Sequence, residues 1–275
     1  MFGRLGACFG SAVGVAVVAC VAVGVAAGAT TSISTCLRSD CPGRITLDIN
    51  GVRTLPRALP RRGAAPMGLM VGARIATTGD SHPSALREAV VDVDKDVEMD
   101  VRGLPVCGYR TIAARDVAAA RQGCRRAIVG SGEAEASLLL PGAERMSTRS
   151  RLTVFNGGRR GRTTMLFVHG YAQLPRPQAL VARIEVEKIA GGLHSVIDVP
   201  AIAGGYGSLT EISLKLRRSF SYRGERKSFL SARCPDGKFI VQTPKLVFKN
   251  EARIPGVAAQ TVLKGGIAVP CKPKR

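Results

Sequence analysis

The chain has 275 residues, of which 45% are hydrophobic, and a formal net charge of +20. This apolar content excludes an intrinsically disordered chain and is sufficient for a hydrophobic core. Aromatic residues make up 4% and tryptophan is absent, so small and branched apolar side chains dominate, which favours a β-rich body. The positive charge predicts attraction to anionic partners without selecting one of them.

The first 29 residues have the pattern of an export signal. Residues 5–27 form an uncharged apolar run, and Ala27-Gly28-Ala29 predicts signal peptidase cleavage between Ala29 and Thr30. The run reaches the roughly 20 residues that span a bilayer, so an uncleaved membrane anchor is one alternative. Lipidation of Cys20 is another. Each alternative places the rest of the chain outside the cytoplasm, in the medium or associated with the cell wall.

Two parts follow the signal. Residues 30–66 are expected to form an N-terminal extension, with a strand over 45–49 and an exposed connector, rich in proline and arginine, over 54–66. Residues 67–275 are expected to form a single β-rich domain that begins with a strand over 67–77.

Acidic residues alternate with mostly apolar ones over residues 88–101, a period of two that indicates a strand. Asp92, Asp94 and Asp96 are the candidate calcium ligands, because hard cations bind carboxylate oxygens. On a strand, however, residues two apart lie roughly 6.6 Å apart along the axis, too far to share one ion easily. The alternative interpretation is a solvated acidic face that pairs with arginines on a neighbouring strand. A turn at residues 94–96 would make the metal site more plausible.

Residues 112–122 predict a helix from their alanine and arginine content, with Asp116 as its N-cap. Short strands separated by turn signals follow, and hairpin tips are expected at residues 156–158 and 223–225. The pattern therefore predicts a mostly β protein, an antiparallel sandwich or barrel with one short helix and disulfide bonds. The predicted strands cover residues 126–129, 134–140, 151–155, 163–169, 180–188, 195–199, 209–216, 228–233, 239–242, 246–249 and 257–263.

Six cysteines lie outside the signal. In an exported chain, disulfides are the default interpretation, and no close Cys-x-x-Cys pairs suggest zinc. Fifteen connectivities are allowed for six cysteines, and pairing between sequence neighbours is the simplest of them. The neighbouring pairs are Cys36 with Cys41, Cys107 with Cys124, and Cys234 with Cys271.

Eight segments of the chain form a specific set: residues 85–88, 103–107, 124–130, 155–158, 203–208, 228–230, 234–237 and 270–271. Together they resemble a family of uncharacterised secreted proteins of high-GC actinobacteria of the Solirubrobacterales type. The resemblance covers nearly the whole mature chain and carries no activity with it. It implies an exported, β-rich protein with two cysteine pairs, in agreement with Cys107–Cys124 and Cys234–Cys271, and Cys36 and Cys41 lie outside that pattern.

The sequence contains no recognisable catalytic frame. His82, His169 and His194 are not in a known motif, and His194, Ser195 and Asp198 lie on one predicted strand whose alternation separates them. A nucleophile elbow and a phosphate-binding loop both require residues that are missing here. We therefore expect no catalytic residue and no cofactor.

The favoured function is a non-enzymatic structural or binding role at the cell envelope. Arginine-rich loops would contact anionic envelope polymers or lipid headgroups, and nucleic acid is not an expected partner of an exported chain. One alternative is a secreted hydrolase with an unrecognised carboxylate pair. The other is a β-barrel that binds a small ligand.

Overall fold

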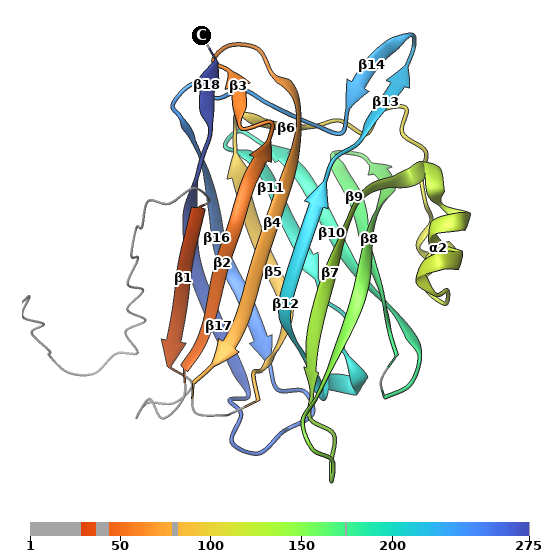
Figure 1. Ribbon diagram of the computed structural model, residues 1–275, viewed down its shortest axis with the longest axis vertical. Coiled ribbons are helices and arrows are strands. Elements are labelled where there is room, and N and C mark those ends of the chain that lie inside the picture. Colours follow the sequence, from red (N-terminus) through yellow and green to blue (C-terminus); the bar gives the residue numbers. More distant parts are fainter. Residues whose placement is uncertain (1–28, 37–43, 79–81, 174, 275) are drawn as a thin grey trace, which may run out of the picture.

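The structure is a computed structural model that describes residues 29–36, 44–78, 82–173 and 175–274. Twelve strands follow one another in a single antiparallel sheet that curls into a barrel (Figure 1). In spatial order they are β1 (Ala29–Cys36), β2 (Arg44–Leu55), β4 (Ala65–Thr77), β12 (Gly207–Leu216), β7 (Ile128–Leu138), β8 (Met146–Arg160), β9 (Thr163–Ala172), β10 (Gln178–Ile189), β11 (Gly192–Asp198), β5 (Ala85–Asp94), β16 (Lys238–Lys249) and β17 (Gln260–Pro270). The predicted mostly β, antiparallel fold is confirmed.

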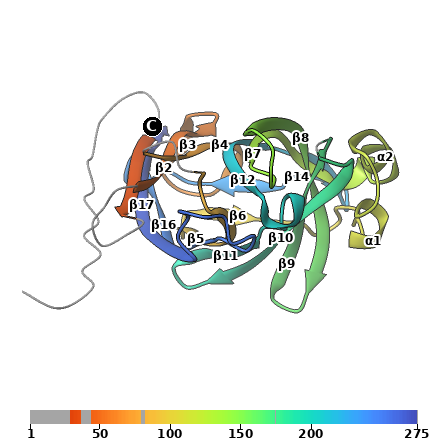
Figure 2. The ribbon, with the colours of Figure 1, turned by 90° about the horizontal axis from the view of Figure 1, so that it is seen from below.

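The two edge strands of this sheet, β1 and β17, lie next to each other and nearly close the barrel. Ile33 of β1 packs directly on Gly265 of β17, where a Cβ atom would lie 2.2 Å from Ile33 Cδ1. Seen from one end, the strands surround an interior, and the helices lie outside the ring (Figure 2). Closure leaves short strand edges, which limits edge-to-edge aggregation.

Each strand alternates between the interior and the solvent. In β4, Val71, Ala73 and Ile75 face inward, whereas Arg74 and Ala76 are exposed. Successive side chains of a strand point to opposite faces of the sheet, so this alternation gives the barrel an apolar lining and a polar exterior.

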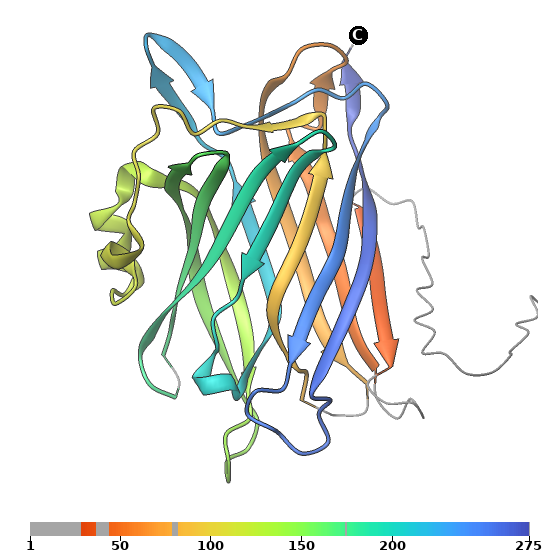
Figure 3. The ribbon, with the colours of Figure 1, turned by 180° about the vertical axis from the view of Figure 1, so that it is seen from behind.

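One end of the barrel, which we call the capped end, is covered by additional strands. β5 ends there, Lys95 and Asp96 form a turn, and the chain crosses as β6 (Val97–Met99). β6 pairs with β15 (Leu230–Ala232), which also pairs with β4. β3 (Ala58–Pro60) pairs in parallel with β18 (Lys272–Lys274). The hairpin of β13 (Ser219–Tyr222) and β14 (Glu225–Ser228) projects beyond this end (Figure 3). We call the opposite end, where β4, β7 and β16 finish, the far end.

A short helical segment packs on the outside of β8 and β9. It contains α1 (Tyr109–Ile112), α2 (Val117–Gly123) and the 3-10 turn η1 (Arg125–Ala127), and a further 3-10 turn, η2 (Ala203–Gly205), lies at the far end. Asp116 is the N-cap of α2, as predicted, and its carboxylate accepts a hydrogen bond of 2.8 Å from the backbone N–H of Ala119. The single predicted helix is therefore two short ones.

Two of the expected disulfides are present, Cys107–Cys124 and Cys234–Cys271. The first joins the two ends of the helical segment to each other, and the second joins the chain after β15 to the end of β17. Cys41 lies outside the described residues, as do the apolar run 5–27 and the residues before the proposed cleavage site. Ala29 and Thr30 begin β1. In the described part of the chain, no helix is long and apolar enough to cross a membrane.

The structure also differs from the sequence-based expectation in the N-terminal segment and in β8. Residues 30–66 do not form a separate extension, because β2 pairs with β4 from Ile45 to Leu55 and β1 pairs with β2. The expected hairpin tip at residues 156–158 is instead a bulge inside β8. The Asn156 side-chain amide donates to the carbonyls of Leu104 and Pro105, so this bulge binds the segment that leads to Cys107.

Candidate ligand-binding cavity

The barrel encloses a cavity of about 370 Å³. This volume is within the range of about 300–1,000 Å³ that is usual for small-molecule sites. Its lining comes from eleven of the twelve barrel strands, all except β1, so the cavity is a property of the whole barrel. Typical lining residues are Leu47, Val71, Ala73, Val91, Ala182, Ile197, Leu214 and Val241.

Inward-facing apolar side chains keep accessible surface inside the barrel. Val71, Ile184, Leu214 and Val241 face inward, yet all four are only partly buried. In a filled core, such side chains would be fully buried at the packing density of protein interiors. Their residual exposure agrees with an interior that side chains do not fill.

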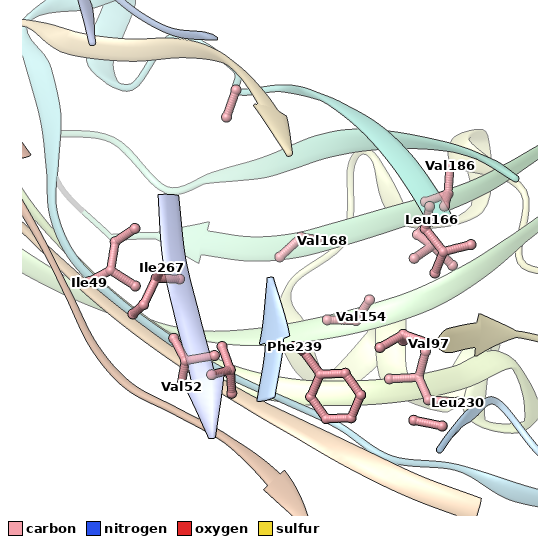
Figure 4. Close-up of a cluster of buried hydrophobic side chains, with 14 of the residues drawn as sticks. Ile49, Val52, Val97, Val154, Leu166, Val168, Val186, Leu230, Phe239 and Ile267 are labelled. Atoms are coloured by element: carbon pink, nitrogen blue, oxygen red, sulfur yellow. The ribbon is translucent and has the colours of Figure 1, made fainter. Parts of the chain in front are cut away.

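Apolar residues close the cavity at the capped end. Phe229, Leu230 and Val97 are buried, with exposures of 0%, 3% and 6%. Phe239 of β16 lies beside Val97 and Leu230 (Figure 4). The Cys234–Cys271 disulfide lies at the same end and fixes the strands that carry these residues.

A buried histidine connects three segments at the far end. His82, which is 2% exposed, precedes β5, and its Nε2 lies 3.1 Å from Ser208 Oγ on β12. Ser208 in turn donates to the carbonyl of Pro83, and His82 Nδ1 lies 3.5 Å from Ser137 Oγ on β7. Burial, with a smaller contribution from the charge of Arg145, lowers the pKa of His82 from 6.5 to about 4. The imidazole is therefore neutral at physiological pH and connects the segment before β5 to β12 and β7.

Few polar side chains line the cavity. Glu135 is the one acidic residue among the described lining residues, and its carboxylate is bound to Arg149 at 2.9 Å on the outer face. Thr243 Oγ1 donates to the carbonyl of Gly265. Thr54, which is 1% exposed, has no hydrogen-bond partner for its Oγ1 within the described part of the chain. The interior thus suits an uncharged, largely apolar occupant.

The two buried threonines predict opposite effects of the same substitution. Thr54→Val is expected to raise the free energy of unfolding by about 1 kcal/mol, because it removes a buried hydroxyl with no partner. Thr243→Val is the matched control and is expected to lower it by about 1 kcal/mol, because it breaks a hydrogen bond. Chemical denaturation of both variants measures the difference, and equal effects of the two would contradict this description of Thr54.

The candidate metal ligands do not converge on one point. Asp92 contacts His194 Nδ1 at 2.6 Å on the outer face, and Asp94 accepts from the backbone N–H groups of Asp96 and Ile240. Asp96 is bound to Arg233 at 2.7 Å. Residues 94–96 do form a turn, but each carboxylate has its own protein partner. Among the described residues, no group of three or more His, Cys, Asp or Glu side chains could hold a metal ion.

His169 belongs to the contact between the barrel and the helical segment. It is fully buried, and its Nε2–H donates to the Arg115 carbonyl at 2.9 Å. Burial lowers the pKa of His169 as well. Its ring lies edge-on to Phe155. His194 and Asp198 are both on β11, but only His194 contacts a carboxylate of β5.

The lining residues are not recognisable as a site from the sequence alone. Alternation over β4 indicates which side chains face inward, but not whether they fill the interior. Small inward residues such as Ala73, Ala134 and Ala182 are the signal that could have indicated a hollow barrel. Comparison of the chain with family models, with curated proteins and with solved structures finds no match.

Proposed function

We propose that this protein binds an apolar small molecule inside its barrel and has no catalytic role. The observation that supports this proposal is the cavity of about 370 Å³ with an almost entirely apolar lining. Apolar cavities of this kind remain dry and accept apolar guests. A β-barrel that binds a small ligand is one of the alternative functions considered from the sequence.

The lining favours one class of ligand. It offers no free charge among the described residues, so a charged group would have to be desolvated without a partner, which is costly. A flexible acyl or isoprenoid chain could fill the space by contact with the branched side chains of the wall.

Export fits this role. The two disulfides indicate an oxidising compartment, and we propose that the apolar run 5–27 directs the chain there. An apolar molecule outside the cell needs a protein interior to remain dispersed in water.

A pair of substitutions on one strand tests the proposal. Ala73 faces the cavity and Ala76 faces the solvent, both on β4. Ala73→Phe places a ring inside the cavity and is expected to weaken binding of an uncharged fluorescent probe, Nile red, at least tenfold. Ala76→Phe is the control and is expected to leave the affinity unchanged.

Fluorescence titration measures the affinity, and denaturation shows that both variants remain folded. An uncharged probe is required because an anionic one would also bind the basic surface. Equal affinity of the parent chain and Ala73→Phe would show that the probe binds elsewhere and would overturn the proposal.

A further inference from the structure

The two ends of the barrel differ strongly in charge. The segments at the capped end contain fourteen Lys and Arg against five Asp and Glu, whereas the described segments at the far end contain three against two. The capped-end segments are residues 56–64, 95–103, 161–162, 190–191, 217–237 and 271–274. The far-end segments are residues 78, 82–84, 139–145, 173, 175–177, 199–206 and 250–259. The capped-end segments therefore carry a net charge of +9 and the described far-end segments +1, so the two ends of the barrel are not equally basic.

Some of the capped-end cations have nearby carboxylates and others project into solvent. Arg102 is bound to Asp100, and Arg233 to Asp96. The projecting hairpin of β13 and β14 carries Arg223 and Arg226, both exposed. Arg223 lies over the ring of Tyr222, 5.3 Å from its centroid. This hairpin extends the positive surface beyond the end of the barrel (Figure 3).

Exposed apolar side chains lie within the same half of the molecule. Ile189, which is 41% exposed, ends β10 at the capped end, and Ile240, which is 37% exposed, is two residues into β16 from the same end. Val106, at 60%, lies against Gly158 near the capped end of β8. Cations with interspersed apolar side chains are typical of surfaces that rest on anionic bilayers.

The N-terminal apolar run is joined to the barrel at this end too. β1 runs antiparallel to β2, and Ala29 pairs with Val52, close to the capped end of β2. The uncharged residues 5–27 immediately precede it in the sequence. A chain inserted in a bilayer through this run would hold its basic end next to the headgroups.

We propose that the capped end docks on an anionic phospholipid bilayer. This interaction surface goes beyond the proposed binding of an apolar ligand and does not depend on it. A bilayer is favoured over a soluble polyanion or a nucleic acid because only a bilayer also accepts the apolar side chains Ile189 and Val106. Lipid headgroups near Arg223 and Arg226 provide the charge complementarity.

Matched charge reversals test the surface. Arg223→Glu/Arg226→Glu changes the capped end, and Arg176→Glu/Arg253→Glu changes the far end by the same charge. Arg223 and Arg253 also share a positive φ of 53°, so the backbone cost of the two double variants is comparable. Binding of the full chain to phosphatidylcholine vesicles, with and without phosphatidylglycerol, is measured at low and high salt.

The expected result is that phosphatidylglycerol strengthens binding at low salt, that high salt removes this gain, and that the capped-end variant loses at least tenfold in affinity. The far-end variant should lose much less. Equal loss in both variants would overturn the proposal, because net charge alone would then drive binding. The proposal would also be overturned if the chain bound a soluble anionic polymer or DNA while phosphatidylglycerol did not strengthen its binding to vesicles.

A tryptophan reporter tests the orientation independently. The chain has no Trp, so Ile189→Trp and Ala143→Trp each introduce a single reporter, at the capped end and at the far end. Brominated phosphatidylglycerol is expected to quench the first and not the second. Quenching of both or of neither would contradict docking through the capped end, while Nile red binding in the cavity would still report the proposed function separately.

Discussion

The double variant Cys234→Ala/Cys271→Ala is expected to lose about 4 kcal/mol of unfolding free energy. The two cysteines are 37 residues apart, and the loop entropy that the disulfide removes from the unfolded chain grows with that separation. Cys234 is fully buried and Cys271 is 8% exposed, between strands that close the capped end. Chemical denaturation of the parent chain and the variant measures the loss.

The control for this prediction is Cys107→Ala/Cys124→Ala. This pair spans 17 residues, so its expected cost is smaller, about 3 kcal/mol. It joins the two ends of the helical segment on the outside of the barrel, so its loss should leave Nile red binding intact. A change of less than about 1 kcal/mol in the Cys234 and Cys271 variant would show that the capped end is held without its disulfide.

Stability is expected to fall as the pH is lowered from 6.5 to about 4. The pKa of His82 is lowered by burial from 6.5 to about 4, so within this window the unfolded chain binds a proton that the folded chain does not. The stability that neutral His82 contributes is fully present above pH 6.5. It is lost as the pH falls toward 4, and the free energy of unfolding decreases by at most about 1.4 kcal/mol per pH unit. Denaturation midpoints measured across this pH range give the slope of stability against pH.

The variant His82→Gln is expected to lose most of this slope, and replacing His169 as well should remove more of it, because the pKa of His169 is also lowered by burial. Asp100 and Glu225 also have lowered pKa values, but their ordinary values of 3.8 and 4.5 place their effects mostly below this window. An unchanged slope in His82→Gln would mean that His82 is accessible to protons in the folded protein.

The fold class could be predicted because it follows from local patterns. Alternation in residues 67–77 gave a strand that the structure confirms as β4, and Arg223-Gly224 forms the tip of the β13–β14 hairpin as expected. Asp116 could be identified as a cap because capping depends on a contact only three residues away. The two confirmed disulfides join near neighbours in the sequence.

What could not be predicted depends on distant contacts. Gly157 and Gly158 resemble a turn, but residues 104 and 105 bind Asn156 and make the segment a bulge. The connector at residues 54–66 resembles a linker, but β3 pairs with the C-terminal β18. The cavity itself depends on how the twelve strands close into a barrel, and the sequence pattern of a single strand does not contain that information. His82 gained significance only when folding brought Ser137 and Ser208 to it.

The location of a bound apolar molecule tests the central claim most directly. A crystal structure of the protein with a bromine-tagged long-chain alcohol would locate the tag by its anomalous signal. The proposal predicts one site inside the barrel, with the chain against Ala73 and Ala182. Bromine found only on the outer surface, with the interior filled by side chains, would contradict a ligand-binding barrel.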